Sequence, residues 1–171
     1  MALPETSALA GDWTLDPAQS TVTLATKSMW NLVKVKGSFT DVSGSGTVTP
    51  DGAASGTLTI AAASVDTANK KRDDHLRSKD FFDADKHPEI TYTVASVSAP
   101  AEDAVTVDGT LTVIGNSRPL TVTAKVSAAD STVTLDATAP VNRKDFGMGF
   151  NQLGMMGLDN TITVHAVFTK A

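Results

Sequence analysis

Alternation of apolar residues with hydroxyl-bearing residues recurs along most of this chain and constrains its fold more than any other feature. In residues 57–62, Leu58 and Ile60 alternate with Thr57 and Thr59. Successive side chains of a β-strand point to opposite faces, so this pattern predicts strands with one covered face and one wet face. Such strands pair antiparallel far more often than parallel, because parallel sheets are usually covered on both faces. The same pattern recurs in residues 20–26, 90–97, 105–113, 120–126, 132–139 and 161–168.

Turn-forming residues separate these runs. Residues 43–46, 50–52 and 128–131 are rich in Gly, Ser, Ala and Asp and predict tight connections between hairpin strands. We therefore predict an all-β fold, an antiparallel barrel of about eight strands, which is wide enough to hold one small ligand. A two-sheet sandwich is the structural alternative. With no repeat and no linker in view, we expect residues 11–171 to form a single domain after an N-terminal extension of residues 1–10.

One charged segment interrupts the β pattern. Residues 69–85 contain no Gly or Pro and few β-branched residues. This composition predicts a short helix over residues 70–78, with Asp66 or Thr67 near its start as the cap. The apolar anchors of this helix are Leu76, Phe81 and Phe82.

Charge and composition exclude several classes of function. The net charge of −5 argues against a nucleic-acid or anionic-membrane partner, since both require a basic field. The absence of cysteine excludes disulfides, thiolate catalysis and cysteine-ligated metal. No run approaches the roughly 18 apolar residues that a membrane span needs, and residues 1–11 do not read as a signal peptide. We expect a cytoplasmic protein, or a periplasmic or secreted one if a signal has been removed.

Histidines and carboxylates give no strong catalytic pattern. The three histidines are His75, His87 and His165. Their spacing matches no metal motif, so we expect no metal site. Asp73, Asp80 and Asp145 could in principle serve as paired carboxylates for hydrolysis. The sequence holds no nucleophile elbow, phosphate loop or dinucleotide fingerprint, so we expect no catalytic residue and no cofactor.

Several motifs make the chain recognisable. The most specific are R-D-D-H-L at residues 72–76, D-F-F-D at 80–83 and N-R-K-D-F-G at 142–147. Weaker ones are W-T-L-D-P-A-Q-S at 13–20, V-K-V-K-G-S-F at 33–39, S-V-D-T at 64–67, H-P-E-I-T-Y at 87–92 and G-T-L-T-V-I-G-N-S-R-P-L at 109–120. From about residue 11 to its end, the sequence resembles the YceI-like family of lipocalin-like polyisoprenoid-binding proteins. It departs from the family pattern at His87, where an aromatic residue is common, and at Ile114, where many relatives carry histidine.

The resemblance implies a fold and a ligand. It implies a closed, antiparallel, lipocalin-like barrel with one short helix and a long isoprenoid or similar lipid inside. It further implies a bacterial lipid-binding or transport protein, and a homodimer, since dimers occur in the family.

Small residues and scarce aromatics favour a hollow barrel over a filled one. Aromatic residues make up only 5% of the chain, so little bulk is available to plug the interior. We predict an elongated apolar tunnel of roughly 300 to 1,000 Å³. A dry, solid core is the alternative. The small residues considered to leave this volume are Ala25, Ala61, Ala62, Ala63, Ala124, Ala137 and Ala139.

Strand faces, the charged helix and a glycine-rich, methionine-rich segment supply the candidate ligand contacts. Arg72 and His75 would meet a polar headgroup at the barrel mouth, the alternative being a solvated helix tied to the barrel by ion pairs. Residues 146–157 combine four glycines with adaptable apolar side chains, and would form a gate or a dimer interface. The predicted ligand-binding residues are Val22, Leu24, Trp30, Phe39, Leu58, Ile60, Arg72, His75, Phe82, Ile90, Tyr92, Leu111, Val113, Val122, Met148, Phe150, Leu153 and Met155.

Three hypotheses of function remain open on the sequence. The first is a carrier or sequestering protein for an isoprenoid or similar long-chain lipid. The second is an enzyme acting on a lipid or isoprenoid derivative through the region of Asp73 and His75. The third is a structural or interaction module with a solid core.

Overall fold

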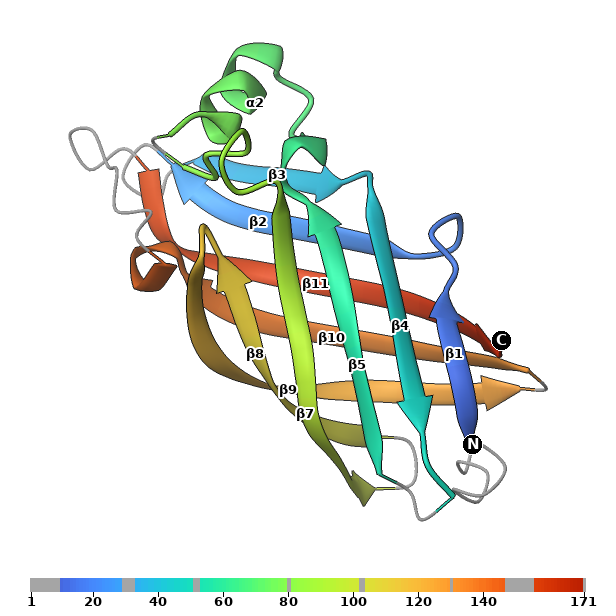
Figure 1. The fold of residues 1–171 in the computed structure, drawn as a ribbon. Helices are drawn as coiled ribbons and strands as arrows, with labels where there is room; N and C mark the ends of the chain where they lie inside the picture. The colour runs from blue at the N-terminus through green and yellow to red at the C-terminus, as the bar shows by residue number, and fades with distance from the viewer. Residues whose placement is uncertain are drawn as a thin grey trace.

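The chain forms one antiparallel sheet that closes into a barrel, with a short helix at one end (Figure 1). The computed structural model describes residues 10–28, 33–50, 53–79, 81–101, 104–129, 131–146 and 156–170. The strands are β1 Gly11–Leu15, β2 Thr21–Ser28, β3 Val33–Phe39, β4 Val42–Val48, β5 Ala54–Ala61, β6 Val65–Asp66, β7 Glu89–Ala101, β8 Ala104–Val113, β9 Asn116–Ala129, β10 Thr132–Asn142 and β11 Met156–Lys170. The helical elements are η1 Ala62–Ser64, α2 Lys70–Arg77 and η2 Arg143–Phe146.

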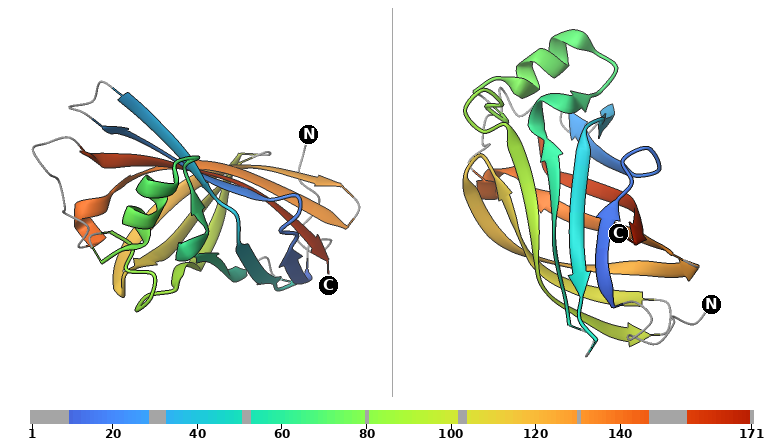
Figure 2. Two further views of the ribbon diagram at one scale, coloured as in Figure 1. Left: turned by 90° about the horizontal axis from the view of Figure 1, so that it is seen from above. Right: turned by 45° about the vertical axis from the view of Figure 1, so that its right-hand side comes forward.

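Closure of the barrel follows from the order of the strands. The sheet runs β1-β4-β5-β7-β8-β9-β10-β11, and β11 pairs again with β1, which closes a ring of eight strands. Strands β2, β3 and β6 extend the sheet beyond β11, and Figure 2 shows the barrel from two further sides. The prediction of an antiparallel, eight-stranded barrel with one short helix is therefore confirmed.

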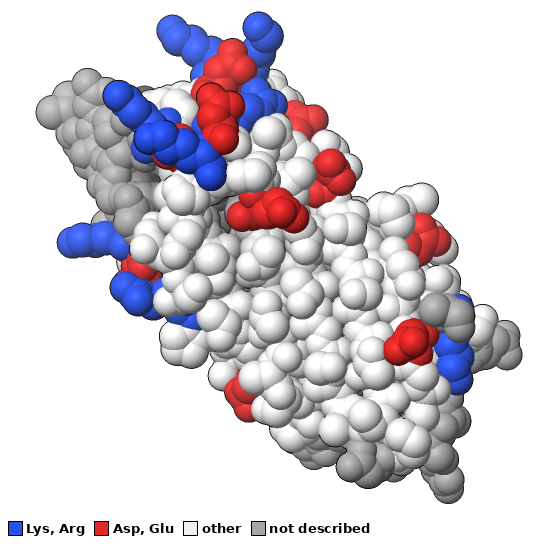
Figure 3. Space-filling model, in the orientation of Figure 1, with Lys and Arg blue, Asp and Glu red and all other residues white. Residues whose placement is uncertain are grey.

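The register explains how the sequence alternation closes the barrel around an apolar interior. Tyr92 of β7 pairs with Leu58 of β5 on one side and Leu111 of β8 on the other, so all three share the inner face. The neighbouring threonines pair with one another on the outer face, as Thr57 does with Thr93. Figure 3 shows the result, a broad uncharged surface over β4, β5 and β7, with charged side chains gathered around α2.

Residues 43–46, predicted as a turn, lie inside β4 instead. The glycines Gly44 and Gly46 take the inner face and the serines Ser43 and Ser45 are exposed on the outer face. The prediction was wrong because glycine and serine were taken as turn formers, although they continue the period-two alternation of a strand.

The predicted helix is present, but its cap differs from the prediction. Helix α2 spans Lys70–Arg77. Its N-cap is Asn69, whose Oδ1 accepts a hydrogen bond of 3.0 Å from the backbone N–H of Arg72. Asp66 accepts from the backbone N–H of Ala68, so it caps the preceding turn. Among the described residues, no helix is long and apolar enough to cross a membrane.

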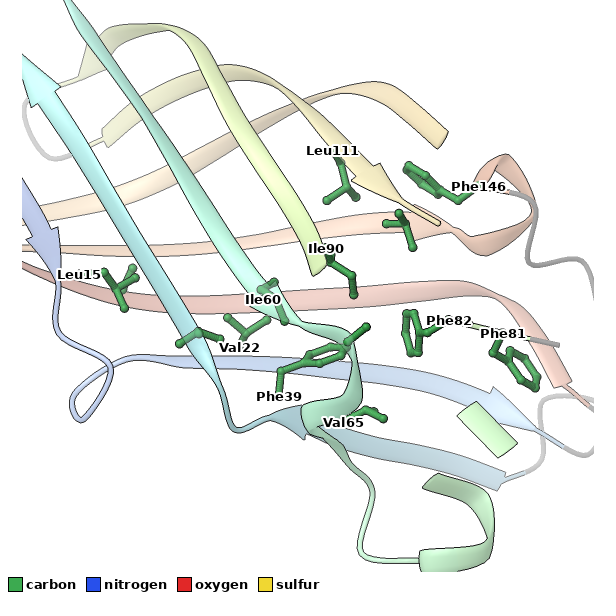
Figure 4. Close-up of a cluster of buried hydrophobic side chains, with 14 residues drawn as sticks. Leu15, Val22, Phe39, Ile60, Val65, Phe81, Phe82, Ile90, Leu111 and Phe146 are labelled. Carbon is green, nitrogen blue, oxygen red and sulfur yellow. The ribbon is translucent and has the colours of Figure 1, made fainter. Parts of the chain in front are cut away.

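Aromatic side chains fill the end of the barrel that lies next to α2 (Figure 4). Phe81 and Phe82 directly follow the helix and are 3% and 8% exposed. The ring of Phe82 meets that of Phe39 on β3 edge-to-face, with centroids 5.8 Å apart. A backbone hydrogen bond of 2.9 Å from the N–H of Phe82 to the carbonyl of Leu76 folds this segment back under the helix. The D-F-F-D motif therefore supplies an aromatic plug.

Candidate binding site in the barrel interior

Away from the aromatic plug, the inner wall is apolar and incompletely covered. The side chains concerned point inward and are only partly buried, although the barrel is closed. Each of these side chains packs against the buried cluster and still keeps accessible surface. They are Leu24, Leu58, Tyr92, Leu120, Leu135, Val141, Ile162, Val164 and Phe168.

Glycines make part of this wall smooth. Gly46 of β4 pairs directly with Gly56 of β5, so the two strands present no side chain to the interior there. A Cβ built on Gly46 would meet only the backbone of its neighbour strand, the carbonyl of Ser55 at 3.0 Å and the Cα of Gly56 at 3.9 Å. Glycine within a strand often marks a place where another group approaches the backbone closely.

Tyr92 lies along the wall and uses its hydroxyl there. Its ring covers Gly109 of β8, since a Cβ at that glycine would stand 2.6 Å from the ring carbon Cζ. The hydroxyl donates a 2.7 Å hydrogen bond to the backbone carbonyl of Leu120 on β9. Burial, and secondarily the negative charge of Asp108, raises the pKa of Tyr92. Tyr92 is therefore neutral at physiological pH, and its hydroxyl is hydrogen-bonded to the wall.

The strand residues predicted to contact a ligand all lie on the inner face. The buried ones are Val22, Phe39, Ile60, Ile90, Leu111 and Val113, and Phe82 joins them from the segment after α2. The partly buried ones are Leu24, Leu58, Tyr92 and Val122. Trp30, Met148, Phe150, Leu153 and Met155 lie outside the described residues. The inner face therefore unites the predicted strand residues, and their contact with a ligand stays a prediction.

The predicted headgroup residue Arg72 is bonded within the protein. Its Nε donates to Oγ1 of Thr67 at 2.7 Å, and its Nη2 donates to the carbonyl of the same residue at 2.8 Å. Asp73, which is 6% exposed, accepts from both the backbone N–H and the hydroxyl of Thr67 at 2.9 and 2.5 Å. Thr67 is thus held from two directions by hydrogen bonds, where the structural alternative expected ion pairs to the barrel. A contact between Arg72 and a headgroup stays a prediction.

His75 of the motif and Arg77 just after the motif also contact protein, whereas Asp74 is exposed. Arg77 donates from Nε to the carbonyl of Ala63 at 2.8 Å and from Nη2 to that of Val65 at 3.2 Å. The ring of His75 packs edge-on against Phe81 at 5.0 Å between centroids. Between α2 and residues 63–66 lies a separate depression of about 450 Å³ with charges of both signs in its lining. These contacts make α2 a clamp across the end of the barrel.

The residues that leave volume inside the barrel differ in part from those predicted. Ala124, Ala137 and Ala139 lie on the inner face. Ala25 and Ala61 pair with exposed polar residues of the neighbouring strands and take the outer face, and Ala63 is exposed in η1, because each falls out of phase with the apolar residues of its segment. The sequence analysis missed the inner-face strand glycines, which the period-two alternation could have revealed. Gly46 and Gly56 are open to the interior, whereas Leu15 covers Gly44 and Tyr92 covers Gly109.

Sequence comparison relates the chain to a known family over nearly its whole length. Residues 13–168 match the family model described as the YceI-like domain. A UPF0312 protein of Staphylococcus aureus is 35% identical over 148 residues, which cover 82% of this chain and 84% of the relative.

Solved structures share the architecture. BcnA of Burkholderia cenocepacia aligns with a TM-score of 0.81 and 28% identity over 90% of this chain and 98% of its own. The YCEI protein of Campylobacter jejuni aligns with a TM-score of 0.70 and 25% identity over 80% of this chain and 85% of its own. A polyisoprenoid-binding domain from Saccharophagus degradans shares the fold at 17% identity, with a TM-score of 0.76 over 93% of this chain and 98% of its own. With its sequence matched from Trp13 to Phe168 and its barrel shared with these proteins, the chain belongs to the YceI-like family.

Proposed function

We propose that this protein binds a long apolar chain, of the isoprenoid or fatty-acyl type, inside its barrel. The observation that carries the proposal is the incompletely covered apolar inner wall, where side chains such as Leu58, Ile162 and Phe168 keep accessible surface. The polyisoprenoid-binding domain of Saccharophagus degradans, which shares the fold, supports this class of ligand.

The energetics favour such a ligand. Each buried methylene group contributes about 0.8 kcal/mol, so a long chain binds well without polar contacts. The wall at Gly46 and Gly56 offers backbone and no side chain to the ligand, while Tyr92 offers a ring whose hydroxyl is already bonded. Selectivity would then depend on the length and width of the interior.

A binding role without chemistry fits the helix better than a catalytic one. The region of Asp73 and His75 was the candidate for an enzyme acting on a lipid. The Asp73 carboxylate accepts two hydrogen bonds from Thr67, and the His75 ring packs against Phe81. We propose a carrier or sequestering protein, and we keep the predicted cytoplasmic location and homodimer as parts of this proposal.

Native mass spectrometry before and after organic extraction tests the proposal. We expect the purified protein to carry a mass that extraction removes and that reappears as a lipid in the organic phase. Turnover of that lipid would support the enzyme instead, and a protein that neither carries nor takes up an apolar chain would support a solid-core module.

A matched pair of variants on one strand locates the ligand. Leu58→Trp fills the interior from β5, whereas Thr57→Trp adds the same bulk on the outer face of that strand. We expect only Leu58→Trp to lower the affinity for a fluorescent fatty acid. Equal affinity in both variants would place the ligand elsewhere.

A further inference from the structure

The wall of the barrel has a seam between β9 and β10. The ladder between these strands runs from the pair Thr132–Ala129 to the pair Ala137–Ala124 and ends there. Both strands continue past this point within the described part of the chain, β9 in its ladder with β8 over residues 116–123 and β10 in its ladder with β11 over residues 138–142. Figure 1 shows β9 curving away from β10 on the side of η2. Among the residues that the structure describes, two strand edges of the same barrel wall therefore face each other without ladder pairs over this stretch.

Two prolines keep this seam from closing into a ladder. Pro119 pairs with Thr110 of β8, and Pro140 pairs with Thr161 of β11. An antiparallel ladder accepts proline only where the residue donates no hydrogen bond to that neighbour. Each proline nitrogen therefore points to the opposite edge, which is the seam. Proline at a strand edge is a common device for leaving that edge unpaired.

The inner lip of the seam is apolar. Leu120 and Val122 of β9 and Val141 of β10 face the interior and are partly exposed. On the outer side, Thr121 and Thr138 are exposed. An apolar chain that crosses the wall here would pass the threonine hydroxyl groups on the outer face and then contact the apolar side chains on the inner face.

One hydrogen bond ties the far end of the seam. The side-chain amide of Asn116, at the start of β9, donates to the backbone carbonyl of Phe146 in η2 at 2.8 Å. The ring of Phe146 is 4% exposed and belongs to the buried cluster. The stretch without ladder pairs is thus bounded by the Ala124–Ala137 pair at one end and by the Asn116–Phe146 hydrogen bond at the other.

The helix end of the barrel offers no comparable route, because Phe81 and Phe82 are buried there beneath α2. We infer that the seam between β9 and β10 is the side entrance through which an apolar chain enters and leaves the barrel, with the Asn116–Phe146 bond as its latch. This inference rests on the proposed function and adds the route to it.

Cross-linking across the seam tests the inference. The chain has no cysteine, so paired substitutions give the only thiols. Thr121→Cys with Thr138→Cys places thiols on opposite lips, to be joined by a short bifunctional thiol reagent. Ser127→Cys with Thr134→Cys places a matched pair across the part of the same two strands that is already paired.

Stopped-flow uptake and release of cis-parinaric acid, a fluorescent fatty acid, is the measurement. We expect the cross-linked seam to slow both rates by about tenfold or more while the dissociation constant changes little, and we expect the control cross-link to change neither rate. If the protein cross-linked across the seam keeps unchanged rates, or if both cross-linked proteins are slowed equally, the proposed entrance is rejected.

A second variant keeps the inference testable if the cross-link distorts the fold. Asn116→Leu removes the latch and should speed both rates, whereas Thr112→Val removes a 2.8 Å side-chain hydrogen bond to Ser117 in the same hairpin and should not. Failure of Asn116→Leu to speed exchange would reject the latch. If the unmodified protein takes up no fatty acid at all, both the proposed function and the entrance are rejected. If the unmodified protein takes up fatty acid and cross-linking the seam does not change the rates, only the entrance is rejected.

Discussion

The two regions of the barrel are built from opposite kinds of residue. At the helix end, charged and aromatic side chains make a closed, fully bonded structure, in which Asp73 and Arg72 both bind Thr67 and Phe82 packs on Phe39. In the body, the inner wall combines glycines with apolar side chains that keep accessible surface, such as Leu58 and Ile162. The charged motif on α2, which resembles a reactive site most, therefore has a structural role. The alternation of apolar and hydroxyl-bearing residues in the strands forms the proposed binding site.

The largest expected difference between the two regions is in the free energy of unfolding lost when one side chain of each is truncated. Phe82→Ala should destabilise the fold by about 3–5 kcal/mol, because it opens a cavity in a closed cluster. Leu58→Ala should cost less than about 2 kcal/mol, because the Leu58 side chain is only partly buried. Urea unfolding monitored by circular dichroism gives both free energies. Equal losses would mean that the body is packed as tightly as the helix end.

Two neighbouring carboxylates on α2 give the next largest contrast. Asp73→Ala should cost about 2–3 kcal/mol, since it leaves the buried N–H and hydroxyl of Thr67 without their acceptor. Asp74→Ala should cost less than about 1 kcal/mol, since it loses only an exposed ion pair with Arg77. The same unfolding experiment serves both variants. A smaller loss for Asp73→Ala than for Asp74→Ala would refute the clamp.

The fold was predictable because one simple rule governs most of it. Alternation gave the strands, their antiparallel pairing and the inner face of residues such as Leu58 and Val113. It failed at residues 43–46, where glycine and serine can equally form a turn, and pairing with β1 and β5 decides for a strand. The helix cap failed for a similar reason, since Asp66, Thr67 and Asn69 all have capping side chains and only the three-dimensional course of the chain selects Asn69.

The candidate site was less predictable than the fold. The phase of each strand followed from its large apolar residues, but the small residues were not placed by that phase, so Ala25 and Ala61 were put inside and the inner-face glycines were overlooked. The seam between β9 and β10 depends on where a ladder stops, which no local pattern specifies. Only Pro119 and Pro140 hint at it in the sequence.

Replacing a glycine of the inner wall by alanine tests whether the wall at that position is open to a ligand or covered by a side chain. Gly109→Ala should destabilise the fold by about 1–3 kcal/mol, because its Cβ would stand 2.5 Å from the carbonyl of Thr93 and 2.6 Å from the Tyr92 ring. Gly46→Ala should cost less than Gly109→Ala, since its Cβ would meet the carbonyl oxygen of Ser55 at 3.0 Å, a tight contact but a longer one than those at Gly109. We expect Gly46→Ala to weaken fatty-acid binding, measured by fluorescence titration, with a smaller loss of stability than Gly109→Ala. Full affinity in that variant would show that the ligand does not reach the β4–β5 wall.

The smallest expected effect is a shift in the pKa of Tyr92, and it reports directly on the inside of the barrel. Tyr92 is the single tyrosine of the chain, so the ultraviolet absorbance of phenolate measures it alone. Burial, and next the charge of Asp108, raises its pKa above the usual value of about 10. The folded pKa is the higher one, so the contribution of Tyr92 to stability is complete below about pH 10 and is lost as the pH rises through the folded value. Asp108→Asn should lower the pKa of Tyr92 part of the way, and Tyr92→Phe should remove the loss of stability in that alkaline range. Fatty acid bound along the wall would withdraw more water from the ring and raise the pKa further, whereas a chain bound outside the barrel would leave it unchanged.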